Sequence, residues 1–93
     1  MNKLETITNL FEEKEIRSVW DSDKEDYYYS VVDVVNALTE VKIPRNYWSD
    51  LKRKLNDEGS QLHEKIVQFK MLAKDGKLRQ TDTLDTKGIL RLI

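Results

Sequence analysis

The sequence predicts a small α+β domain in which β-hairpins alternate with helices. Turn-bounded alternating stretches at 15–30 and 66–83 predict strands, and helically spaced apolar residues at 30–38 and 44–55 predict helices. We expect an N-terminal antiparallel meander or hairpin, two central helices, a second β-hairpin and a C-terminal helix. A chain of 93 residues suits one domain, spanning 1–93.

The composition is typical of a globular protein, with 39% hydrophobic and 35% charged residues. Because the sequence has no cysteine, disulfides and thiolate metal sites are excluded. No apolar run approaches the roughly 18 residues that a membrane helix needs, and the N-terminus lacks the layout of a signal peptide. We therefore expect a cytoplasmic protein without a membrane partner.

Charge is distributed unevenly along the chain. Residues 1–40 carry ten acidic and four basic side chains, a net charge of −6, and residues 41–93 carry seven acidic and twelve basic ones, a net charge of +5. This asymmetry points to a polyanionic partner for the second half. The acidic first half suits either a basic protein partner or a solvated, turn-rich edge, and its acidic residues include Glu12, Glu13, Glu15, Asp23, Glu25 and Asp26.

The first half is expected to be mainly strand. A short apolar segment at 7–11 is followed by a turn at 12–14, and residues 15–21 then alternate as a strand. A second turn at 22–25 leads into a strand at 26–30 that contains three consecutive tyrosines. Three adjacent tyrosines cannot share one face, so at least one should be exposed. An aromatic cross-strand pair is their expected use, with base stacking as the alternative.

A stretch rich in valine follows at 30–38. Its β-branched residues favour a strand, but the apolar residues have helical spacing: they are Val31, Val34, Val35 and Leu38. We predict a short helix in which Ser30 is the N-cap and Asp33 is a capping residue.

The second helix, at 44–55, is the element around which we organise the chain. Pro44 suits its first turn, where a missing N–H costs nothing, and Gly59 suits its C-terminal stop. The side expected to face inward comprises Tyr47, Trp48, Leu51 and Leu55, and the opposite side comprises Arg45, Ser49, Lys52 and Arg53. The outer face is either a binding surface or the solvated side of an amphipathic helix. Together with the preceding helix it fits a helix-turn-helix or an ordinary helical hairpin.

The second hairpin joins strands at 66–72 and 78–83 through an Asp-Gly turn. It is basic, and its cationic residues are Lys70, Lys74, Lys77 and Arg79. Its place after two helices is that of the wing in a winged-helix arrangement; alternatively, its lysines protect a sheet edge against aggregation. The last helix begins with Asp85 as N-cap and stops within an apolar pattern, so we expect the domain to be truncated at its C-terminal end.

No catalytic constellation is found. The sequence contains no nucleophile elbow, P-loop, dinucleotide-binding glycine pattern or His-Glu helix motif. His63 is the only histidine and lies in a polar connection, while Asp82 and Asp85 are interpreted as a turn residue and a cap. We expect a non-catalytic protein without a metal or other cofactor. The hypothesis of a nuclease lacks a credible metal cluster.

Four segments, in this order, carry a family resemblance: Ser-Val-Val-Asp-Val-Val at 30–35, Pro-Arg-Asn-Tyr-Trp at 44–48 followed by Leu51-Lys52, Leu-Ala-Lys-Asp-Gly-Lys at 72–77, and Thr81-Asp82 through Asp85-Thr86 to the final Leu-Arg-Leu-Ile. Over nearly the whole chain they resemble the Bro-N domain. This family comprises N-terminal domains of baculovirus Bro proteins, prophage antirepressors and the bacterial DNA-damage-inducible protein D group, and the resemblance is closest to the bacterial group.

The resemblance implies a small α+β domain associated with DNA binding, relief of repression and stress-responsive regulation. The positions that match the family motif are Arg45, Asn46, Tyr47 and Trp48, with Lys52 beside them. The sequence departs from the family in two places. Residues 41–43 are more apolar than the usual approach to the proline, and the chain ends where family members usually continue.

We therefore expect a DNA-binding regulatory domain of the phage or prophage antirepressor type. Phosphate contacts would come from Arg45, Lys52 and Arg53, supplemented by the four basic hairpin residues. Asn46 is the candidate for a base edge, because its amide can pair with adenine, and Ser49 shares the outer face. The alternative is a protein-interaction module that binds a repressor or host regulatory protein without contacting DNA. The DNA sequence, the groove and the oligomeric state are left open.

Overall fold

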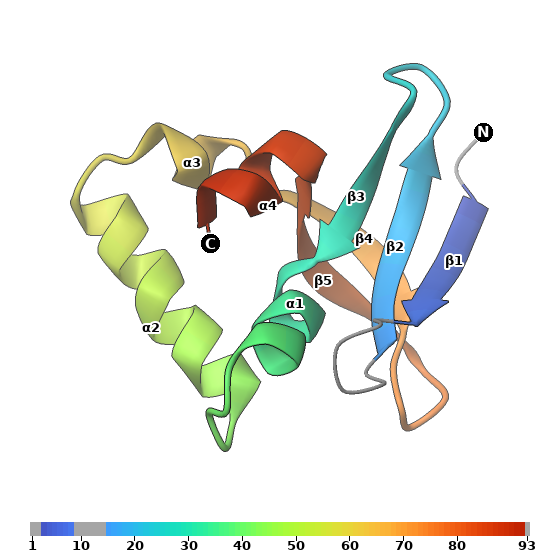
Figure 1. Ribbon diagram of the computed structural model, residues 1–93, viewed down its shortest axis with the longest axis horizontal. Coiled ribbons are helices and arrows are strands. Elements are labelled where there is room, and N and C mark those ends of the chain that lie inside the picture. Colours follow the sequence, from blue (N-terminus) through green and yellow to red (C-terminus); the bar gives the residue numbers. More distant parts are fainter. Residues whose placement is uncertain (1–2, 9–14, 93) are drawn as a thin grey trace.

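A computed structural model of the chain describes residues 3–8 by their backbone and residues 15–92 in full. The elements are β1 (Lys3–Thr8), β2 (Glu15–Asp21), β3 (Asp26–Ser30), α1 (Val31–Leu38), α2 (Pro44–Asp57), α3 (Gln61–Glu64), β4 (Val67–Leu72), β5 (Leu78–Asp85) and α4 (Thr86–Leu92) (Figure 1). The described strands form one antiparallel sheet in the order β1-β2-β3-β5-β4. The predicted α+β class, meander, central helices, second hairpin and final helix are confirmed. The short helix α3 was not predicted, and the turn predicted at 12–14 lies outside the described residues.

The sheet curls so that its two halves face each other. Only three residue pairs join β3 to β5. The rings of Tyr28 on β3 and Phe69 on β4 lie 5.4 Å apart, although β5 separates these strands in the sheet order. In a flat sheet, strands two places apart are separated by nearly 10 Å. The curl therefore creates an interior of its own, in which Val19, Tyr28 and Met71 are buried.

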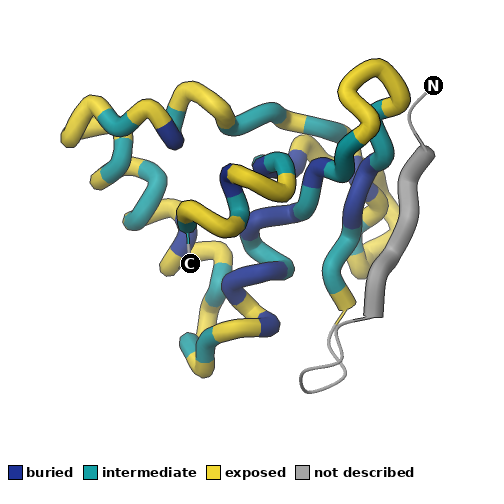
Figure 2. Tube along the Cα trace, turned by 45° about the horizontal axis from the view of Figure 1, so that its top comes forward, coloured by how far each residue is buried: buried dark blue, intermediate teal, exposed yellow. Residues whose placement is uncertain are grey.

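The opposite face of the sheet carries the helices. A core cluster there combines side chains from three helices and one strand: Val31, Val35, Trp48, Leu62 and Leu84. Figure 2 shows the resulting pattern, with buried residues concentrated in α1 and the central strands and exposed residues dominating the turns. Trp48 is the only residue of α2 that is buried, so α2 touches the core through a narrow stripe and leaves most of its surface exposed.

The helix ends follow the predicted caps. The Ser30 hydroxyl accepts a hydrogen bond from the Asp33 N–H at 3.3 Å and begins α1. Gly59 ends α2 with a φ of +66°, the left-handed conformation in which glycine avoids a steric cost. Asp85 accepts a bond from the Gly88 N–H at 2.7 Å and caps α4. The ambiguous valine stretch is thus a helix, as its spacing predicts.

Two sequence-based expectations about the strands are wrong. None of the three tyrosines is exposed: Tyr28 is buried within the curl, and Tyr27 and Tyr29 are half-buried on the other face. The expected cross-strand pair does form, since the Tyr27 ring lies edge-on to Trp20 at 4.9 Å. In addition, β5 continues to Asp85, so Asp82 is a strand residue and does not belong to a turn.

Candidate nucleic-acid interface

The predicted binding helix α2 is fastened to the sheet through Asp82. One carboxylate oxygen of Asp82 accepts hydrogen bonds from the Trp48 indole N–H at 2.8 Å and from the Lys52 ammonium at 2.7 Å. The other accepts a bond from the Gln68 amide on β4 at 2.9 Å. We call these four residues the Asp82 cluster. It ties one turn of α2 to both strands of the second hairpin.

Burial favours the neutral form of Asp82, whose side chain is only 10% exposed. The hydrogen bonds from Lys52, Gln68 and Trp48 stabilise the carboxylate, and together they outweigh burial and hold the pKa of Asp82 below its usual range. The cluster is therefore charged and fully bonded at neutral pH. Its chemical role is to orient α2, because each polar atom of the carboxylate is already used within the fold.

The Asp82 cluster corrects two assignments on α2. Lys52 lies one turn after Trp48 and shares its side of the helix, so its ammonium turns toward the sheet and is not free on the outer face. Tyr47, expected to pack inward, is 44% exposed. The helix is anchored by Trp48, and Tyr47 lies at the edge of the anchoring stripe. It is therefore part of the accessible surface at the start of α2.

The outer face of α2 presents Arg45, Asn46 and Ser49, all exposed. Within residues 15–92, none of the three has a hydrogen bond or ion pair from its side chain to another side chain. Arg53 is also exposed, but its guanidinium reaches Asp50 at 3.3 Å, an exposed pair three residues apart. In the first two turns of α2 the outer face therefore presents polar side chains that are free to bind a partner. In the next turn the charge of Arg53 is partly neutralised by Asp50.

The second hairpin extends from the Asp82 cluster as a ladder of cross-strand pairs. Gln68 pairs with Asp82, Lys70 with Gln80, and Leu72 with Leu78. Because alternate residues of a strand share a face, all six side chains lie on the face that carries α2. The four residues beyond the cluster are exposed: Lys70, Leu72, Leu78 and Gln80. We call these four the hairpin ladder. The structure thus brings Lys52 and Lys70 to one face of the sheet.

The remaining basic hairpin residues divide between the turn and the opposite face. Lys74 and Lys77 are exposed in the turn, whose Gly76 has a φ of +83°. Arg79 lies across from Met71 on the other face of the hairpin and bonds to Asp75. This bond holds the pKa of the Asp75 carboxyl below its usual range and raises that of Arg79. Arg79 is therefore separated from Lys70 and already has a partner.

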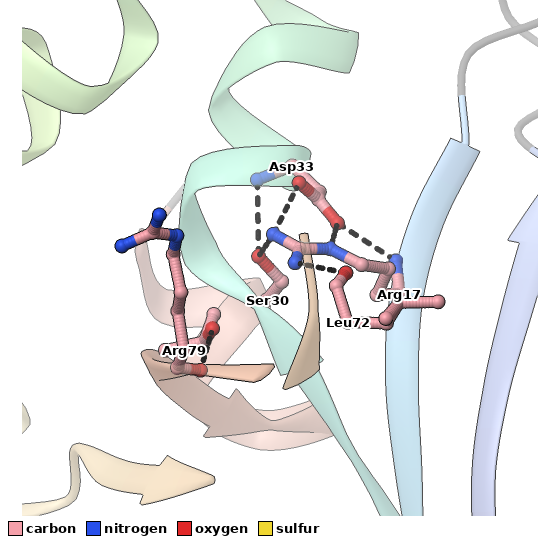
Figure 3. A network of polar contacts seen from close by, with 6 residues as sticks. Arg17, Ser30, Asp33, Leu72 and Arg79 are labelled. Atoms are coloured by element: carbon pink, nitrogen blue, oxygen red, sulfur yellow. Dashed lines mark hydrogen bonds and ion pairs between the residues drawn. The ribbon is translucent and has the colours of Figure 1, made fainter. Parts of the chain in front are cut away.

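An ion pair missed by the sequence interpretation holds α1 in place. The guanidinium of Arg17 on β2 donates to both carboxylate oxygens of Asp33, at 2.7 and 3.1 Å, and to the Leu72 carbonyl at 2.9 Å (Figure 3). The Arg17 N–H also donates to Asp33 at 2.9 Å. Asp33 therefore contributes its N–H to the cap, while its carboxylate serves the ion pair. The only sequence signal was an arginine on the strand face that it shares with Val19.

An apolar groove lies between α1, α4 and the sheet. It has a volume of about 230 Å³, and it is lined by Ile16 and Tyr29 from the strands, Val34 and Leu38 from α1, and Thr86, Ile89 and Leu90 from α4. None of the predicted DNA-binding residues lines it. Leu38 and Leu90 are 45% and 65% exposed. The groove is a separate surface feature with almost purely apolar walls.

No metal centre emerges in the part of the chain that the structure describes, since nowhere in it do three His, Asp or Glu side chains gather closely enough to hold an ion. His63 is half-buried in α3 and belongs to none of these clusters. Among the described helices, none has the length and apolar character to cross a membrane. Of the acidic residues expected to attract a basic partner, Glu12 and Glu13 lie outside the described residues.

Comparisons with protein-family models, with curated proteins and with solved structures yield no match to this chain.

Proposed function

We propose that this chain is a non-catalytic, DNA-binding regulatory domain of the phage or prophage antirepressor type. The observation that carries the proposal is the exposed start of α2. There Arg45, Asn46 and Ser49 are uncommitted on a helix whose other side is anchored by the Asp82 cluster. A rigidly held helix with exposed polar residues in its first turns suits entry into the major groove, where N-terminal residues of a recognition helix contact bases.

The ion pairs divide the predicted cationic residues by role. Arg45, Lys70, Lys74 and Lys77 have no ion-pair partner within residues 15–92 and supply the phosphate contacts. Lys52, Arg53 and Arg79 each bond to an aspartate of the chain itself. Of these, Lys52 acts as a positioning residue for α2. Asn46 remains the candidate for direct readout of an adenine edge.

The resemblance to the Bro-N family agrees with this function, and a cytoplasmic location is part of the proposal. The domain would occupy DNA chiefly through phosphate contacts, so its affinity would depend strongly on salt. Regulation would follow from occupancy of the site rather than from any reaction on the DNA.

The test is fluorescence anisotropy with random duplex and single-stranded DNA at two salt concentrations. We expect duplex binding that weakens with salt. The Arg45→Ala variant should bind all sequences more weakly and reduce the slope of log K against log salt by roughly one. Lys87→Ala is the matched control, because Lys87 is an exposed cation on α4 outside the proposed surface. The proposal fails if duplex DNA is not bound at low salt, or if binding is independent of salt.

A second candidate is a protein-interaction module that binds a repressor or host regulatory protein without contacting DNA. The apolar groove supports it. Its volume of about 230 Å³ is below the roughly 300–1,000 Å³ of small-molecule pockets, which suits an apolar side chain or two of a protein partner. Recovery of a repressor in a pull-down, lost in Leu90→Ser, together with no shift of labelled DNA, would favour this candidate over the first.

A further inference from the structure

We propose that the β4–β5 hairpin is a second DNA-contacting arm, which inserts the Leu72–Leu78 pair into the minor groove beside the major groove entered by α2. This inference rests on the proposed DNA-binding function and assigns a role to a surface that this function alone leaves unexplained. It concerns the hairpin ladder (Lys70, Leu72, Leu78 and Gln80) and the turn that follows it.

The first observation is an exposed apolar pair in a cationic setting. Leu72 and Leu78 lie directly opposite each other on neighbouring strands and are 52% and 61% exposed. Lys70 precedes them on the same face, and Lys74 and Lys77 follow in the turn, all exposed. Solvent contact with two adjacent large aliphatic side chains is unfavourable, so the pair is expected to have a partner. The lysines make that partner anionic.

The second observation is that hydrogen bonds hold the hairpin at its turn and at the end of β4. In the turn, the Ala73 N–H donates to the Lys77 carbonyl at 2.8 Å and the Gly76 N–H donates to the Ala73 carbonyl at 3.0 Å. The Arg17 guanidinium donates to the Leu72 carbonyl at 2.9 Å and ties the arm to β2. An arm held in one conformation loses little entropy on binding. This favours insertion of a side-chain pair that has to separate stacked bases.

The third observation is the spacing between the arm and α2. The hairpin ladder follows directly on the Gln68–Asp82 pair, where Asp82 bonds to Trp48 and Lys52 of α2. Four residues of extended strand, about 13 Å, separate this pair from Leu72 and Leu78. Adjacent major and minor grooves are offset by half a turn of B-DNA, roughly 17 Å. The distance from α2 to the two leucines is these roughly 13 Å plus part of the width of the helix, which is comparable to the offset between the grooves. The helix and the arm can therefore enter neighbouring grooves.

Leucine side chains placed between base steps in the minor groove unstack the bases and kink the duplex, while nearby lysines contact the flanking phosphates. This chemistry matches the composition of the ladder and turn. A membrane carrying anionic lipids is the other surface that combines negative charge with an apolar interior. The pairing of the hairpin ladder with the polar outer face of α2, which presents Arg45, Asn46 and Ser49, favours DNA.

The experiment compares wild type with the Leu72→Ser/Leu78→Ser variant on one duplex that carries 2-aminopurine at successive positions and a dye at each end. We expect the wild type to kink the duplex by about 20–90°, read as increased energy transfer, and to raise 2-aminopurine fluorescence at one step. The variant should retain most of the binding and the salt slope but lose both signals. Because both leucines are exposed, their replacement leaves the core intact. The matched control is Leu90→Ser, which removes an exposed leucine of α4.

Binding without a kink, or a kink that the variant retains, overturns the arm and leaves the proposed function standing. Absence of wild-type binding at low salt defeats the proposed function itself. A further measurement uses vesicles of phosphatidylcholine and phosphatidylserine. Vesicle binding that is lost in the variant, combined with an unbent duplex, assigns the hairpin to a membrane surface and also overturns the inference.

Discussion

Removal of the Asp82 carboxylate should destabilise the fold far more than removal of any exposed aspartate. In Asp82→Ala the Trp48 indole N–H, on a residue only 3% exposed, loses its acceptor, and leaving a buried donor unpaired costs about 1–3 kcal/mol. The ion pair with Lys52 adds less, because the Lys52 side chain is 37% exposed, and such pairs contribute about 0.2–1 kcal/mol. We expect a total loss of about 1–4 kcal/mol in the free energy of unfolding.

This loss is a large share of the roughly 5–14 kcal/mol expected for a domain of 93 residues. It corresponds to a decrease in Tm of roughly 5–30 °C. The measurement is urea denaturation followed by tryptophan fluorescence, together with thermal melting by circular dichroism. Asp50→Ala, on the anchored helix α2, is the matched control. Its carboxylate is 74% exposed, so the expected change is within about 0.5 kcal/mol. If Asp82→Ala costs no more than Asp50→Ala, the Asp82 cluster does not anchor α2.

The same site predicts a dependence on pH. Despite its burial, the pKa of Asp82 is held below its usual range by three donors, so the folded state binds a proton there less readily than the unfolded chain. The resulting stabilisation is present above the ordinary aspartate pKa of about 3.9 and is lost as the pH falls through the lower value of the folded state. Asp82→Asn mimics the protonated form. Its stability should therefore fall below that of wild type at pH 7, and the difference should shrink as the pH falls below the ordinary aspartate pKa and through the lower pKa of the folded state. A constant difference down to pH 2 would contradict this linkage.

Two further substitutions test the packing of α1 and the hairpin turn. Arg17→Met should lower the free energy of unfolding in urea by about 2–4 kcal/mol, because it leaves the Asp33 carboxylate, 16% exposed, without its cation. Arg53→Met, which removes an exposed arginine, should be nearly neutral. Equal losses in the two variants would rule out a special role for the Arg17–Asp33 pair. Gly76→Ala should cost about 1–2 kcal/mol, because its φ of +83° is unfavourable for residues with a Cβ. Gly76→Asn should restore much of that loss, since asparagine tolerates this conformation, and two equally damaging variants would mean that backbone strain is not the cause.

The contacts of Asp82 and Arg17 could not be predicted from the sequence, because they join residues far apart in the chain. Asp82 meets Trp48 and Lys52 across 34 and 30 positions, and no local pattern marks a carboxylate that lies between two polar neighbours as a buried acceptor. The sequence alone favours a turn at Asp82, since aspartates are common in turns. Similarly, Asp33 was assigned to the cap alone, although its carboxylate bonds to a strand 16 positions earlier.

Lys52 shows how a helical wheel fails at the boundary between faces. Its position lies beside Trp48 on the wheel as well as beside Ser49, and local spacing cannot decide which neighbour it follows. The presence of Asp82 beneath α2 decides it, because a long lysine side chain extends its ammonium toward a carboxylate that is within reach. Tyr47 is the opposite case. The helical wheel places it on the inward side, but its side chain is 44% exposed in the folded domain.

Local physical rules determined most of the elements directly from the sequence. Serine and aspartate caps, the proline at the start of α2, the glycines in left-handed conformations and the period of the apolar residues act over a few positions, so the chain itself specifies them. The curl of the sheet, the partial burial of Asp82 and Asp33, and the alignment of the hairpin ladder with α2 were decided by the tertiary structure alone. These features depend on which distant surfaces meet, and the free energy of such contacts exists only once the chain has folded.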